Sequence, residues 1–139
     1  MMILERVTIS SSDTPLHVAA MLGHVYFVKE LIRRNTNAVE YLHELNQHGF
    51  GAIYMAAATG HNVTVRELLK VSNEVCNLKG MNGMTPLYCA CTKGRVEIIS
   101  HLIAGSCTTI SEVAVRGETA LHLAVKNNQF QALETLWNG

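Results

Sequence analysis

The tetrapeptide TPLH at residues 14–17 occurs again, with one change, as TPLY at residues 85–88, and these two copies contain both prolines of the chain. The same frame reappears as TALHLAV from Thr119 and, in a degraded form, as GAIYMAA from Gly51. The four starts, at residues 14, 51, 85 and 119, are separated by 37, 34 and 34 residues. A sequence that repeats itself at such a period predicts a stack of similar structural units.

Further columns of matching residues extend the repeat on both sides of the tetrapeptide. Turn-forming residues stand two positions before each start, as Ser12, Gly49, Gly83 and Gly117, and nine positions after it, as Gly23, Gly60, Gly94 and Asn128. Three apolar columns follow: Val28, Val65, Ile99 and Leu133; Leu31, Leu68, Leu102 and Leu136; and Ile32, Leu69, Ile103 and Trp137. A spacing of three residues and then one places these columns on one face of a helix.

Each unit is therefore predicted to contain two helices. The hydroxyl groups of Thr14, Thr85 and Thr119 can cap the first helix, because they accept a hydrogen bond from a backbone N–H that has no helical partner. Pro15 and Pro86 then fill the first helical position, where a missing N–H costs nothing. The glycine column ends this helix, since Gly, like Asn, tolerates the left-handed backbone conformation. The second helix carries the apolar columns.

The units differ from one another at a few positions. Unit two has Gly51 and Ala52 in place of the capping threonine and the proline, so we expect its first helix to be the weakest. Three additional residues lie between units one and two, and an insertion of this size costs little. Leu45, Leu78 and Val113 stand six residues before the next start and are expected to anchor the connecting loops.

The repeated unit resembles the ankyrin repeat, a helix-turn-helix module with a β-turn, whose signature contains T-P-L-H-x-A. The resemblance implies an all-α repeat solenoid with β-turn or hairpin loops, in which stacked units create a core that none could form alone. It makes residues 1–139 a single ankyrin-repeat domain with units at about residues 10–45, 46–79, 80–113 and 114–139.

A narrower resemblance concerns the stretches RGETALHLAVKNNQFQALETL from Arg116 and GHVYFVKELIRRN from Gly23. Both are similar to plant ankyrin proteins that carry a C-terminal multi-pass membrane domain and are associated with defence and stress signalling. This resemblance implies that the chain is the cytosolic ankyrin part of such a protein, at the cytosolic face of a membrane. No apolar run in the chain approaches the roughly 20 residues that span a bilayer, so we expect no direct membrane insertion by this chain.

Composition and charge exclude several classes of protein. The chain is 48% hydrophobic and 16% charged, which indicates a globular fold and not a disordered one. Its 11 Lys and Arg balance 11 Asp and Glu, so it lacks the positive footprint of nucleic-acid binders, and we expect no nucleic-acid partner. The start MMILERV lacks the features of a secretory signal, and four cysteines are too few for a disulfide-rich scaffold. We therefore expect reduced thiols and a cytoplasmic location.

Histidine and cysteine raise the alternative of a thiol- or metal-dependent enzyme, which would need bound zinc or a reactive thiol. The best cluster joins Cys89 and Cys91 with His101 and Cys107, but side chains two apart on a helix point about 200° away from each other. For the histidine of the tetrapeptide, the family resemblance implies a bond to the threonine hydroxyl and to neighbouring loops. No known nucleophile, zinc-protease, phosphate-loop or dinucleotide motif is present. We predict no catalytic residue, no metal and no cofactor.

The resemblance also implies a partner-binding surface, a concave groove formed by the β-turn tips and the ends of the first helices. Its positions fall four, three and one residues before each start, and seven and eight residues after it. These positions hold Ser10, Ser11, Asp13, Met21 and Leu22 in unit one; Gln47, His48, Phe50, Ala58 and Thr59 in unit two; Met81, Asn82, Met84, Thr92 and Lys93 in unit three; and Val115, Arg116, Glu118, Lys126 and Asn127 in unit four.

The apolar, aromatic and basic members of this set are the predicted partner-binding residues. They are Met21, Leu22, His48, Phe50, Met81, Met84, Lys93, Arg116 and Lys126. Apolar residues that no core requires indicate a contact surface, and methionine adapts to varied partners. We predict a non-catalytic scaffold or adaptor that binds a protein segment with apolar anchors and an acidic flank. The alternative is that these side chains pack on their own turns.

Neither end of the chain carries a polar capping unit, and Trp137 lies in a core column close to residue 139. Stacked repeats need such caps to stay soluble. The sequence therefore predicts either an exposed apolar end that self-associates or a chain cut from a longer stack.

Overall fold

The computed structural model describes residues 13–77, 84–104 and 119–138. Its helices are α2 (Pro15–Leu22), α3 (Val25–Arg34), α4 (Ala38–Leu42), α5 (Ala52–Thr59), α6 (Asn62–Val71), the 3-10 helix η1 (Asn73–Asn77), α7 (Pro86–Lys93), α8 (Val96–Ala104), α9 (Ala120–Lys126) and α10 (Phe130–Asn138). Within these ranges no strand forms. The architecture is the all-α repeat solenoid that the sequence predicts.

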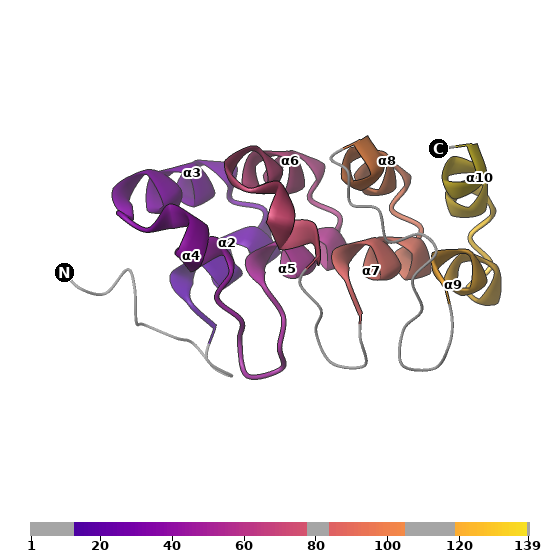
Figure 1. Ribbon diagram of the computed structural model, residues 1–139, viewed down its shortest axis with the longest axis horizontal. Coiled ribbons are helices and arrows are strands. Elements are labelled where there is room, and N and C mark those ends of the chain that lie inside the picture. Colours follow the sequence, from indigo (N-terminus) through magenta and orange to yellow (C-terminus); the bar gives the residue numbers. More distant parts are fainter. Residues whose placement is uncertain (1–12, 78–83, 105–118, 139) are drawn as a thin grey trace.

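The helices form two rows (Figure 1). The first helices of the units, α2, α5, α7 and α9, pack side by side in that order. The second helices, α3, α6, α8 and α10, form the other row, and each contacts the first helix of its own unit. The units therefore stack in chain order, and the core lies between the rows.

The first helices begin as predicted. The Oγ1 atoms of Thr14, Thr85 and Thr119 each accept a hydrogen bond from the backbone N–H three residues later, and Pro15 and Pro86 follow at the start of the helix. Gly51, at the equivalent place in α5, provides no side-chain cap. The predicted cap pattern is confirmed, including its absence in unit two.

The first helices also end as predicted. Gly23, Gly60 and Gly94 have φ values of 74°, 84° and 70°, in the left-handed region. Asn128 takes the same role in unit four with a φ of 59°. Because the left-handed conformation costs an L-residue about 1–2 kcal/mol, glycine is favoured at these three turns.

The predicted apolar columns form the core, with one departure. Val28, Val65 and Ile99 are fully buried, as are Leu68 and Leu102. Trp137 belongs to the same pattern, yet its side chain is 77% exposed. Within the described residues no unit follows unit four, so this column has nothing to pack against there.

The connecting segments differ from the prediction. The longer link between units one and two contains α4, which buries Tyr41 and Leu42, and η1 buries Val75 and Cys76 in the next link. Leu45 is exposed, so it does not anchor its loop. Leu78 and Val113 lie outside the described residues. The buried residues stand two to four positions before those that we predicted, because each link folds into a helical turn first.

Candidate partner-binding surface

The ends of the first helices form a row, because α2, α5, α7 and α9 pack side by side. Leu22 stands at the end of α2 and is 52% exposed. Thr59 is exposed at the end of α5, and Lys93 and Lys126 are exposed at the ends of α7 and α9. Cations are favourable at helix C-termini, where the helix dipole is negative. The row therefore changes from apolar in unit one to basic in units three and four.

Phe50 contacts other residues of the fold through both its ring and its backbone carbonyl. Its ring stacks on that of Tyr54, with centroids 4.2 Å apart and an angle of 6° between the planes. Its carbonyl oxygen accepts hydrogen bonds from His17 Nε2 at 2.9 Å and from the backbone N–H of Asn46 at 3.0 Å. The half-buried ring thus packs on its own unit, as the alternative interpretation predicted for this residue.

The histidine of the tetrapeptide links two units. In unit one, the backbone N–H of Thr14 donates to His17 Nδ1 at 3.1 Å, so this nitrogen is an acceptor and Nε2 carries the proton. Nε2 then donates to the Phe50 carbonyl in unit two. His122 makes the same bonds to Thr119 in unit four. The structural role implied by the family resemblance is confirmed for His17.

Asn46 holds the turn before unit two, and the sequence did not single it out. Its side-chain oxygen accepts hydrogen bonds from the backbone N–H groups of His48 and Phe50, and its Nδ2 donates to Asp13 Oδ1 at 2.9 Å. Asn46 is only 7% exposed. These bonds fix the turn before α5, the helix whose cap position holds Gly51 and therefore no capping side chain.

The remaining predicted residues divide into packed and exposed ones. Met84 is half-buried and packs against the hydrophobic core, whereas the exposed His48 lies with its ring centroid 6.5 Å from that of Phe50. Met21 is half-buried. Met81 and Arg116 lie outside the described residues. The described structure therefore exposes Leu22, His48, Lys93 and Lys126 and packs Phe50 and Met84.

A set of hydrogen bonds joins neighbouring units beside this row, and sequence reasoning missed it. In each case the donor is the side chain directly after the turn residue of one unit, and the acceptor is a backbone carbonyl near the first-helix end of the preceding unit. The bonds run from His61 Nε2 to Met21 at 3.1 Å, from Arg95 Nη2 to Ala58 at 3.0 Å, and from Gln129 Nε2 to Thr92 at 3.4 Å. The only sequence signal is a polar side chain directly after each turn residue, and the three donors are of three different types.

The position of these donors gives a second reason, besides the positive φ, for glycine at the end of the first helix. A Cβ on Gly23 would lie 2.5 Å from Nδ1 of His61, and one on Gly94 would lie closer still to Oε1 of Gln129. Real Cβ atoms do not approach other atoms this closely. At Gly23 and Gly94, a side chain would therefore force the donor of the next unit to move, in addition to the strain of a positive φ.

The cysteines of α7 are packed in the core. Cys89 and Cys91 are free and buried, and burial raises the pKa of the Cys91 thiol to about 12. Burial also raises the pKa of Cys89, which hydrogen bonds to Tyr54. Cys76 is disulfide-bonded, so the expectation of reduced thiols is wrong at that position. Buried neutral thiols are poor nucleophiles and poor metal ligands.

Comparison with known proteins places the repeat in a family. The family model described as ankyrin repeats (3 copies) matches residues 3–79, 33–111 and 53–139. This chain belongs to the ankyrin repeat family. Ankyrin repeats are generally protein–protein interaction modules. None of the helices in the described ranges is long and apolar enough to cross a bilayer.

Several curated proteins are similar to the chain. It is 28% identical over 116 residues to "Nuclear factor NF-kappa-B p105 subunit" of Gallus gallus, covering 82% of this chain and 11% of that protein. It is 32% identical over 102 residues to "Ankyrin repeat-containing protein At5g02620" of Arabidopsis thaliana, covering 71% of this chain and 20% of that protein. "Ankyrin repeat-containing protein ITN1" of Arabidopsis thaliana is 29% identical over 119 residues, with 72% and 20% covered. The chain spans a fifth or less of the length of these relatives.

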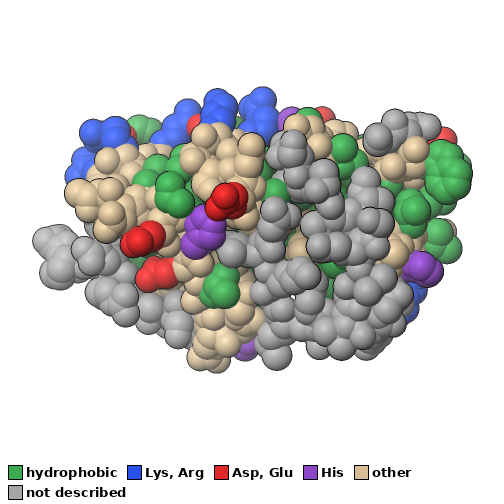
Figure 2. Space-filling model, in the orientation of Figure 1, with side chains coloured by type: hydrophobic (Ala, Val, Ile, Leu, Met, Phe, Trp, Pro, Cys, Tyr) green, Lys and Arg blue, Asp and Glu red, His purple; other side chains and the backbone are tan. Residues whose placement is uncertain are grey.

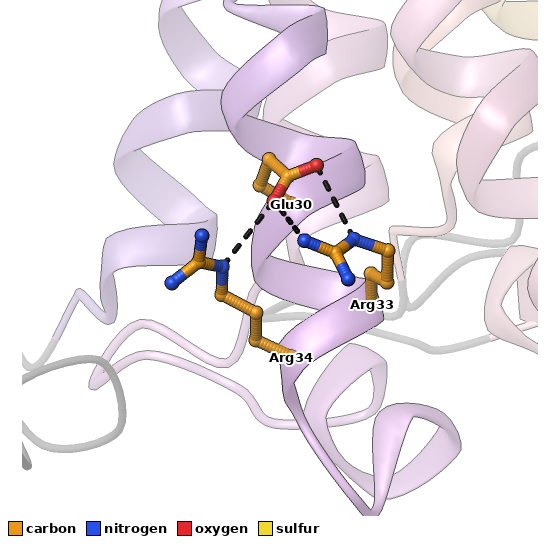
Figure 3. A network of polar contacts seen from close by, with 3 residues as sticks. All are labelled: Glu30, Arg33 and Arg34. Atoms are coloured by element: carbon orange, nitrogen blue, oxygen red, sulfur yellow. Dashed lines mark hydrogen bonds and ion pairs between the residues drawn. The ribbon is translucent and has the colours of Figure 1, made fainter.

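The outer row of the ankyrin stack carries a second group of cations. Lys and Arg side chains gather along the edge formed by α3 and α6 (Figure 2), where the exposed ones are Lys29, Arg33, Arg34, Arg66 and Lys70. Glu30 lies among them, 2.6 Å from Arg33 Nη2 and 3.3 Å from Arg34 Nε (Figure 3). The hydrogen bond from Arg33 lowers the pKa of Glu30. The net charge near zero therefore hides a basic edge that the sequence analysis did not assign.

Proposed function

We propose that this chain is a cytoplasmic, non-catalytic scaffold or adaptor that binds a segment of a partner protein along the row of first-helix ends. The partner segment would carry an apolar anchor for the part of the row around Leu22 and an acidic flank for Lys93 and Lys126. His48 is exposed in the turn before α5 and also belongs to the proposed contact surface. Arg116 and Met81, predicted from the repeat frame, extend it.

The observation that supports this proposal is the change in character along the row. Leu22 exposes an apolar side chain that the core does not use, while Lys93 and Lys126 expose positive charge. An apolar contact contributes affinity, and complementary charge directs the orientation and speed of encounter. A segment lying along the row in one direction would satisfy both parts.

A display library of random peptides tests this function directly. We expect the folded chain to select peptides that contain an aliphatic or aromatic residue followed by acidic residues. Leu22→Glu should weaken the selected peptides by about tenfold or more, since central apolar contacts of interfaces cost 1–2 kcal/mol or more when lost. The double variant Lys93→Glu, Lys126→Glu should weaken them and remove the salt dependence of binding.

The matched control is Lys29→Glu, Lys70→Glu, which makes the same charge change on the outer helices. It should leave the affinity within about twofold, because exposed charges separated by more than about 10 Å are largely screened at 0.1 M salt. Equal binding by wild type and all three variants, or loss of binding only in the control, would overturn the assignment of the surface.

A second candidate function is favoured by the similarity to the two Arabidopsis thaliana proteins. In this proposal the chain is the cytosolic ankyrin part of a plant membrane protein in defence or stress signalling. Sequencing the complete transcript decides it: several apolar runs of about 20 residues after residue 139 would support this role. A transcript without them would refute it and leave the scaffold proposal unchanged.

A further inference from the structure

The outward face of unit four is formed by columns that are covered in the other units. The residues two, six, fourteen and eighteen positions after each start are Leu16, Ala20, Val28 and Ile32; Ile53, Ala57, Val65 and Leu69; and Leu87, Cys91, Ile99 and Ile103, all of them buried or half-buried. In unit four they are Leu121, Val125, Leu133 and Trp137. Val125 is 63% exposed and Trp137 is 77% exposed.

These columns are the surface on which the next unit packs. They are covered wherever a further unit follows in the described structure, as α5 follows α2 and α9 follows α7. The face of unit four is therefore continuous in position and in apolar character with three interfaces inside the same molecule. At each internal interface, the two helices of the following unit cover this face with apolar side chains of their own.

The face is also hollowed. Leu121, Val125, Leu133 and Trp137 line an open depression of about 500 Å³, with His122 and Lys126 at its polar margin. Hydrophobic side chains are visible at this end of the molecule, over α9 and α10 (Figure 2). The depression can hold a large side chain, and Trp137 stands beside it with most of its surface in solvent.

Three residues make this face different from the internal ones. Val125 replaces Ala or Cys, Trp137 replaces Ile or Leu, and Asn128 replaces the glycine over which the donor of a following unit lies. Each change adds volume at a point of close approach between units. A second copy that stacked head to tail in the internal register, with Phe27 of its first unit against this face, would meet that volume.

We propose that unit four pairs with unit four of a second copy of this chain about a two-fold axis, so that Trp137 of each copy enters the depression of the other. A symmetric pairing brings the same apolar patch together from both sides and closes as a dimer. This surface meets the row of first-helix ends only at Lys126, which lies at the margin of the depression. The dimer therefore goes beyond the proposed function and leaves Leu22 and Lys93 open in both copies.

Trp137 is the only tryptophan of the chain, which makes it a direct reporter of this interface. We would record its emission wavelength and the molar mass by sedimentation equilibrium over a micromolar to millimolar concentration series. The wild type should show a shift of emission to shorter wavelength that follows the change from one to two chains. Val125→Glu keeps the reporter but places a charge in the depression, so its emission and mass should stay those of the monomer.

Phe27→Glu is the matched control, because Phe27 is 60% exposed on the first unit, at the opposite end of the stack. It should dimerise like the wild type. Trp137→Lys, followed by sedimentation alone, is a second interface variant in case Val125→Glu loses its helical circular dichroism. A wild type that stays monomeric throughout overturns the proposal. So does a mass that rises beyond two chains and is lost equally in Phe27→Glu, because that result indicates head-to-tail stacking.

Discussion

The imidazole ring of His61 lies over Gly23, so close that a Cβ on Gly23 would come within 2.5 Å of Nδ1. The same ring donates from Nε2 to the carbonyl of Met21 at 3.1 Å. The turn that ends the first helix of unit one and the hydrogen bond that joins it to unit two therefore occupy the same place. A substitution of either residue should therefore lower the stability of both units.

Gly23→Ala should lower the free energy of unfolding by about 2 kcal/mol or more, because it adds left-handed strain to a steric overlap. Denaturation in urea measures this loss. In a His61→Ala background the overlap is absent, so the same change should cost only the backbone strain of about 1 kcal/mol. Equal losses in both backgrounds would show that the ring moves aside freely.

Asn46→Ala should destabilise the chain by about 2–3 kcal/mol, since it leaves backbone donors of the turn without their acceptor in a mostly buried site. Gln47→Ala, at the exposed neighbouring position, should change stability by less than about 0.5 kcal/mol. Hydrogen exchange should locate the effect of Asn46→Ala in α5. A uniform loss of protection over all units would contradict a local role.

Thr64→Val is expected to stabilise the protein by about 1 kcal/mol. Thr64 is fully buried in α6, and its Oγ1 has no hydrogen-bond partner among the described residues. Valine fills the same space without a polar atom that must be desolvated. Thr64→Ser keeps the hydroxyl and should not gain stability. The thermal midpoints of the two variants, recorded together with wild type, distinguish these outcomes.

Met84→Asp should cost at least about 2 kcal/mol, because it places a carboxylate against the core on which Met84 packs. Leu22→Asp, on the half-exposed end of α2, should stay within about 0.5 kcal/mol of wild type. Urea midpoints of the two variants test this contrast. If both changes are tolerated equally, Met84 belongs with the exposed residues after all.

The stability should fall at high pH, in part through Cys91. Burial raises its pKa to about 12, whereas the ordinary pKa of the thiol is 9.0. The unfolded chain therefore releases this proton first, so the contribution is complete below pH 9 and is lost as the pH rises from 9 to 12. Between about pH 8 and pH 10, wild type should lose about 1 kcal/mol more than Cys91→Ala, which has no thiol to titrate. Parallel loss in both proteins would contradict this cause.

The sequence predicted the features that each unit determines for itself. Threonine caps, left-handed turns and the apolar columns depend on residues within one unit, and the repeat shows each of them several times. The hydrogen bonds from His61, Arg95 and Gln129 to the preceding unit were missed, because these donors share no residue type although they share a role.

The surface was predicted less well than the fold for a similar reason. The repeat frame identifies positions near the row of first-helix ends, but it does not say which side chains have room to pack. The ring of Phe50 stacks on Tyr54 and Met84 packs against the core, whereas the side chain of Leu22 is exposed. The partner-binding role of Leu22, His48, Lys93 and Lys126 stays a prediction.

The glycine and the donor that follows it also constrain how the units can be rearranged by recombination. Units one to three each end their first helix with the glycine that the next donor needs, so exchanging their order preserves this match. Unit four carries Asn128 at that place, and moving it to an interior position would set a side chain where the neighbouring donor must lie. Gene rearrangements that keep the reading frame are thus not all equivalent: a unit placed directly after Asn128 would meet a side chain where the other turns have none.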